Sequence, residues 1–156
     1  MAVKLVRAPN SPILIVAGLA LLLLAAVGVE RAVLNPHHYR VPVVVLAEPS
    51  IITAIQGMAL LFVAIRRSKF AGVTAVIVAA FISFGMAFGV VLPLAFGRPV
   101  HVTWWTAIDL AIVAAMLWPS IFPWDRTAKK PVLFWMAVTF GTLTLLVASA
   151  VLLARL

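Results

Sequence analysis

Long apolar runs, separated by short loops that hold most of the charges and prolines, make up nearly the whole chain. A helix of roughly 20 apolar residues crosses the hydrocarbon core of a bilayer. The pattern therefore predicts an all-α integral membrane protein with about five transmembrane helices in a single bundle over residues 1–156. The expected spans are 13–29, 49–65, 70–94, 102–118 and 131–154. The second and fourth spans are short and have an acid within or beside them, so the number five depends on them.

Prolines and a glycine mark the ends of the expected spans. We expect Pro49 in the first turn of the second helix, after a bent apolar lead-in at 41–47. Proline fits a first turn because the N–H that it lacks has no partner there. Gly97-Arg98-Pro99 should end the third helix, Pro119 and Pro123 should end the fourth, and Pro131 can open the fifth.

Composition strengthens the membrane assignment. Of the 156 residues, 65% are hydrophobic and 10% are charged, and the mean hydropathy is +1.22. A soluble domain of this length could not bury so much apolar surface, whereas a bilayer lets helix exteriors stay apolar. The absence of cysteine excludes disulfides, thiolate metal sites and a cysteine nucleophile.

The basic residues predict the orientation, because cytoplasmic loops carry the excess of Lys and Arg. With the N-terminus inside, the cytoplasmic set is Lys4, Arg7, Arg66, Arg67, Lys69, Arg126, Lys129 and Lys130. The outer set is Arg31, Arg40, Arg98 and Arg155. This bias explains the net charge of +8 without nucleic acid and places the C-terminus outside. We expect a multi-pass protein of the inner (plasma) membrane.

Nearly all polar residues of chemical interest fall on the expected outer side, where they suggest one ligand-binding pocket. The candidate set is Asp109, Glu48, His101, Trp105, Gln56 and Arg98. Asp109 lies in mid-span, where a carboxylate costs about 2.5–3.5 kcal/mol and usually faces a partner or a wet cavity. His101, Trp105 and Asp109 are four residues apart and share one helix face. The alternative is a structural acid bonded to Arg98 or to a neighbouring helix.

Two other acids have simpler interpretations. Glu48 precedes Pro49, where the positive end of a helix dipole would favour it, or it pairs with Gln56 and Asp109. Glu30-Arg31 is most simply an interfacial pair at the end of the first helix.

Metal binding has little support in the sequence. His37, His38 and His101 could supply imidazoles, with Glu48 or Asp109 as an oxygen ligand. Adjacent histidines point in different directions, however, and no HxxxH or HxxE spacing occurs. We predict no metal and no cofactor, although a bound lipid or quinone is compatible with the pattern.

The third span contains Gly85-xxx-Gly89. Small residues at this spacing let helices approach closely. We expect packing within the chain, with self-association or a partner contact as the alternative.

One stretch resembles a known family. Residues 55–67, IQGMALLFVAIRR, followed by Phe70-Ala71-Gly72, are similar to the second-to-third helix passage of DoxX-like small membrane proteins. The resemblance implies inner-membrane residence, sometimes beside quinone-linked oxidoreductases, and supplies no catalytic residues. Such proteins usually have four helices, so the fifth span here departs from their pattern.

Three functions follow as hypotheses. The first is a non-catalytic accessory or structural subunit of a larger membrane assembly, such as a respiratory or electron-transfer complex. The second is a binding protein or small transporter for an apolar or amphipathic ligand, in the outward-facing pocket around Asp109. The third is a membrane-embedded enzyme acting on a lipid, isoprenoid or quinone, with Asp109 or Glu48 as acid or base. No nucleotide-binding or hydrolase motif is present, so the balance is against an enzyme.

Overall fold

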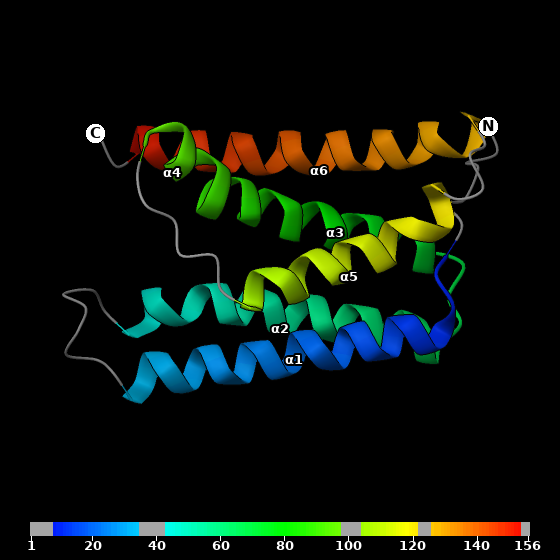
Figure 1. The fold of residues 1–156 in the computed structure, drawn as a ribbon, viewed down its shortest axis with the longest axis horizontal. Helices are drawn as coiled ribbons and strands as arrows, with labels where there is room; N and C mark the ends of the chain where they lie inside the picture. The colour runs from blue at the N-terminus through cyan, green and yellow to red at the C-terminus, as the bar shows by residue number, and fades with distance from the viewer. Residues whose placement is uncertain (1–7, 35–42, 98–103, 122–125, 154–156) are drawn as a thin grey trace. The chain divides into compact units, whose positions relative to one another are not determined.

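The fold is known from a computed structural model that describes residues 8–34, 43–97, 104–121 and 126–153. Every regular element in these ranges is helical, which confirms the all-α prediction for the described part of the chain (Figure 1). The elements are α1 (Ser11–Leu34), α2 (Val43–Ile65), α3 (Ala71–Met86), a π-helical segment η2 (Ala87–Val91), α4 (Leu92–Ala95), α5 (Trp104–Ile121) and α6 (Arg126–Leu153). Because α3, η2 and α4 are continuous, the described chain forms five helical segments at the five predicted places.

Three of these helices are long and apolar enough to cross a membrane. Their apolar stretches are Ser11–Arg31, Ala71–Val90 and Lys130–Ser149. The two others, Pro49–Ile65 and Trp104–Pro119, are apolar but shorter. They correspond to the second and fourth predicted spans, on which the number of crossings depends.

Two prolines expected to open helices lie inside them instead. Pro49 is inside α2 and Pro131 inside α6, whereas α5 ends at Ile121, between Pro119 and Pro123, where the sequence placed the end of the fourth helix. Each proline removes one backbone hydrogen bond. In an apolar environment a helix keeps all its other backbone groups bonded, so it continues through a proline more readily than in water. The predicted helix starts at Pro49 and Pro131 were therefore wrong by about five or six residues.

The π-helical segment η2 was not predicted. It precedes Pro93, which lacks the N–H that would bond to the carbonyl of Gly89, and whose ring would clash with that carbonyl. A widened turn before the proline accommodates both effects. The long third helix therefore changes its geometry near its end.

A left-handed residue lies on each side of this long helix. Arg67 has φ 44°, and Ser68 N donates to Val63 O, a Schellman-type end to α2. Gly97 has φ 64° and its N–H donates to Leu94 O, which ends α4 as the sequence predicted.

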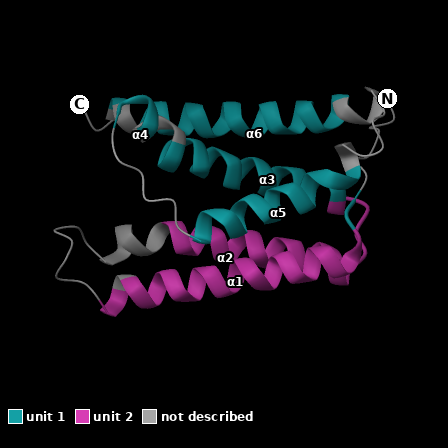
Figure 2. Cartoon of the chain, in the orientation of Figure 1, with its two compact units in different colours: residues 1–9, 72–156 teal, residues 10–71 magenta. Residues whose placement is uncertain are grey.

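The chain divides into two compact units (Figure 2). One comprises residues 10–71, with α1 and α2. The other comprises residues 1–9 and 72–156, with the helices from α3 to α6.

In the unit of residues 10–71, α1 and α2 form an antiparallel hairpin. Gly18 approaches Gly57 and Leu61 near one end, and Gly28 approaches Ser50 near the other. A Cβ atom on Gly18 would lie 2.8 Å from Leu61 Cγ, and one on Gly28 would overlap the Ser50 hydroxyl. The two backbones can come this close only because the side chains at the contact are absent or small.

In the other unit, α3 and α6 run parallel and α5 runs against them. Val76 of α3 packs with Val132 of α6, and further along both helices Phe84 meets Phe140 edge to face at 5.5 Å. The valine cluster also includes Leu117, near the end of α5. The starts of α3 and α6 therefore lie at the same end of this unit.

Four hydroxyl groups of α6 are bonded within the helix. Side-chain donors reach the carbonyl four residues earlier at 2.8–2.9 Å, from Thr139, Thr142, Thr144 and Ser149. These bonds leave α6 with little demand for polar partners on its outer surface.

Candidate functional site

The central residue of the predicted pocket, Asp109, lies half-buried on α5, one turn after the half-buried Trp105. The ring of Trp105 stacks on that of Trp104, with the centroids 3.4 Å apart. No described residue forms a hydrogen bond or ion pair with Asp109. The suggested bond to Arg98 concerns a residue outside the described ranges.

The remaining members of the predicted pocket are divided between the two units or lie outside the described residues. Gln56 is half-buried on α2, which also holds Glu48. These two residues belong to the unit of residues 10–71, and Asp109 belongs to the other. The convergence of Asp109 with Glu48 and Gln56 therefore stays a prediction. Four predicted residues lie outside the described ranges: His37, His38, Arg98 and His101.

The expected role of Glu48 at a helix start is wrong. It is the sixth residue of α2, because the apolar lead-in at 43–47 is itself helical. The favourable effect of a helix dipole on a carboxylate fades beyond the first turn. Only the pairing alternative for Glu48 stays open.

No group of three metal-binding side chains occurs among the described residues. The histidines proposed as weak metal ligands all lie outside those ranges. The metal alternative therefore stays untested.

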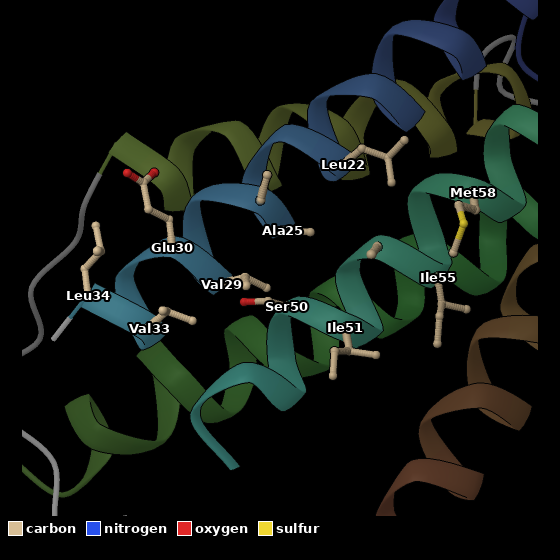
Figure 3. Close-up of a pocket in the computed structure, with 12 residues that line it drawn as sticks. Leu22, Ala25, Val29, Glu30, Val33, Leu34, Ser50, Ile51, Ile55 and Met58 are labelled. Carbon is tan, nitrogen blue, oxygen red and sulfur yellow. The ribbon is translucent and has the colours of Figure 1, made fainter. Parts of the chain in front are cut away.

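The hairpin contains a groove of about 700 Å³ that the sequence did not reveal (Figure 3). Apolar side chains form almost all of its wall. On α1 the lining residues are Leu22, Ala25, Ala26, Val29, Glu30, Val33 and Leu34, and on α2 they are Ser50, Ile51, Ala54, Ile55 and Met58.

Small side chains hollow out this groove. Ala25, Ala26 and Ala54 leave space where larger residues would fill the surface between the helices. In Figure 3, Leu22 and Met58 lie toward one end of the groove, and Val33 and Leu34 lie toward the other. The groove thus runs lengthwise along the hairpin.

Polar atoms are rare in the groove and come from two residues. Ser50 is buried, 9% exposed, and its hydroxyl points toward α1 beside Gly28 (Figure 3). Glu30 is exposed and lies near the end of the apolar stretch Ser11–Arg31. The interpretation of Glu30-Arg31 as a simple interfacial pair overlooked that Glu30 shares a helix face with Ala26 and Val33. The alanines on that face were the sequence feature from which the groove could have been predicted.

The Gly85-xxx-Gly89 motif does not pack within the described structure. Both glycines are exposed, and a Cβ atom on either would meet nothing within 4 Å. Within its own unit the motif therefore has no packing partner among the described residues, and its packing elsewhere in the chain stays a prediction. Beside the glycines, Phe84 and Phe88 stack with centroids 4.6 Å apart, and Phe88 is 46% exposed.

Together these features define a class: an all-helical protein of the membrane type, with apolar surfaces and few polar side chains among its described residues. The chain matches no protein-family model, no curated protein and no solved structure.

Proposed function

We propose that the chain is a non-catalytic accessory subunit of a larger assembly in the inner membrane, and that it binds a helix of a partner subunit through the Gly85–Gly89 face. The single observation that carries this proposal is the open space at both glycines. Small residues one turn apart allow close contact of helices in a bilayer, where packing drives association.

The chemistry of the surface supports a packing role over catalysis. The described helices present large apolar side chains outward, and α6 is the least buried of the three long apolar helices. Its described hydroxyls are bonded within the helix. An enzyme would need converging titratable groups, and within its own unit Asp109 forms no hydrogen bond or ion pair with a described residue.

The proposed orientation places the starts of α3 and α6 on the cytoplasmic side. Arg66, Arg67 and Lys69 precede α3, and Lys130 lies in the second turn of α6. Since α3 and α6 are parallel, both basic clusters lie at the same helix end. That arrangement agrees with the positive-inside rule.

The test is residue-specific crosslinking in the native membrane. A photoreactive amino acid replaces Phe88, beside the open glycines, or Leu23, which is 65% exposed on α1, as the control. We expect one defined heterologous adduct from position 88 and none of that mass from position 23. Crosslinking only to a second copy of the chain, or to nothing but lipid, would overturn the accessory role.

A second measurement ties the adduct to the glycines. The double variant Gly85→Leu/Gly89→Leu should abolish the adduct and the co-purification of the same partner in mild detergent. The matched control is Gly141→Leu, because Gly141 is an equally open helical glycine with no second glycine one turn away. If the double variant kept the partner at full stoichiometry, the Gly85–Gly89 face would not be the partner-binding surface.

A further inference from the structure

The groove between α1 and α2 has the form of a ligand site in the membrane. Its volume of about 700 Å³ lies within the range of about 300–1,000 Å³ that is usual for ligand pockets. Its walls come from both helices of one compact unit, so the hairpin alone defines it.

We propose that this groove binds one phospholipid with an ammonium headgroup, whose acyl chain lies between α1 and α2 and whose ammonium group contacts Glu30. This inference is independent of the proposed accessory role, because it concerns different residues in the other unit.

The depth of the groove fits an acyl chain that enters from the membrane interface. Glu30 lies one residue before the end of the apolar stretch Ser11–Arg31. Leu22 is eight residues earlier on the same helix, about 12 Å deeper at 1.5 Å per residue. The wall between them is apolar, as an alkyl chain requires.

The sparse polar groups select the headgroup and disfavour a quinone. A buried quinone needs hydrogen-bond donors for its carbonyl oxygens, and Ser50 supplies the single hydroxyl donor in the groove wall. Glu30 instead places a carboxylate at the interface, where it complements an ammonium group. A phospholipid without a cationic headgroup would gain the apolar contacts and lose this one.

The test measures lipid retention by native mass spectrometry of the full chain, reconstituted with equimolar phosphatidylethanolamine and phosphatidylglycerol. We expect one retained lipid per chain, with phosphatidylethanolamine preferred. Glu30→Gln should lower that preference about two- to fivefold, as expected for an exposed ion pair. Equal retention of the two lipids by the unaltered chain, or an unchanged preference in Glu30→Gln, would overturn the headgroup contact.

Filling the groove tests the location. Ala26 is exposed in the groove wall, so Ala26→Phe can occupy the acyl-chain space, and we expect it to abolish retention of both lipids. The matched control, Ala114→Phe, alters an exposed alanine on α5 and should retain lipid normally. Full retention in Ala26→Phe would overturn the site.

A second variant covers the case in which Ala26→Phe fails to fold. Ile55 is 56% exposed and lines the opposite wall, so Ile55→Ser removes apolar contact without adding volume. It should weaken retention of both lipids equally. Unchanged retention would show that any bound lipid belongs to the general lipid layer around the protein.

Discussion

Gly18 of α1 and Gly57 of α2 face each other so closely that a Cβ atom on Gly57 would lie 2.8 Å from the carbonyl oxygen of Gly18. The obstacle is backbone, which cannot rotate away as a side chain can. The absence of a side chain at Gly57 is therefore a condition for the observed hairpin.

Gly57→Ala should destabilise the hairpin by about 1–3 kcal/mol, the usual cost of overpacking. The measurement is the free energy of unfolding in mixed micelles. Gly141→Ala is the control, because its Cβ would meet open space, and helix propensity predicts stabilisation of up to about 1 kcal/mol. Equal effects of the two substitutions would contradict the close contact.

The contact of Gly28 with Ser50 predicts a coupled pair. Gly28→Ala should be destabilising because its Cβ would overlap the Ser50 hydroxyl, whereas Ser50→Ala leaves the position 50 Cβ at 3.3 Å. Ser50→Ala should therefore restore part of the loss, with a coupling of at least about 0.5 kcal/mol in a double-mutant cycle. Strict additivity of the two substitutions would argue against this contact.

The lack of native cysteine makes the orientation directly measurable. Ser68→Cys and Phe96→Cys each introduce one thiol, just before α3 and just after α4. In intact cells a membrane-impermeant thiol reagent should label position 96 and leave position 68 unlabelled. Inverted vesicles should reverse the pattern. The opposite labelling would overturn the positive-inside orientation.

Asp109 should limit insertion of the short helix α5. Removing a carboxylate from mid-span recovers about 2.5–3.5 kcal/mol on insertion scales. Asp109→Leu should therefore lower the fraction of Lys130→Cys chains that are labelled from outside, since position 130 stays outside when α5 fails to insert. Asp109→Asn, which removes the charge and keeps a polar group, should give an intermediate fraction.

A measurement of thermal unfolding tests whether Asp109 has a structural role. No described residue bonds to Asp109, so Asp109→Leu should not lower the midpoint of thermal unfolding. A clear fall in that midpoint would indicate that Asp109 stabilises the folded bundle.

The sequence predicted where the helices lie but not how they end. Apolar run length located the five helical segments, since continuous apolar runs of this length favour helices over strands. Pro49 and Pro131 were expected to open helices, but α2 and α6 begin six and five residues earlier. Local patterning also cannot reveal a π-helical turn, so η2 before Pro93 went unpredicted.

The sequence by itself determined the helical membrane class, the places of the helices and the distribution of basic residues, since each depends on local composition. Only the tertiary structure decided which small residues are in contact. It packed Gly18 against Gly57, left Gly85 and Gly89 open, and hollowed a groove beside Ala26. Apolar faces are chemically alike in a bilayer, so hydrophobicity does not determine which faces pack together. Which faces pack together depends on the shapes of helices that lie far apart in the sequence.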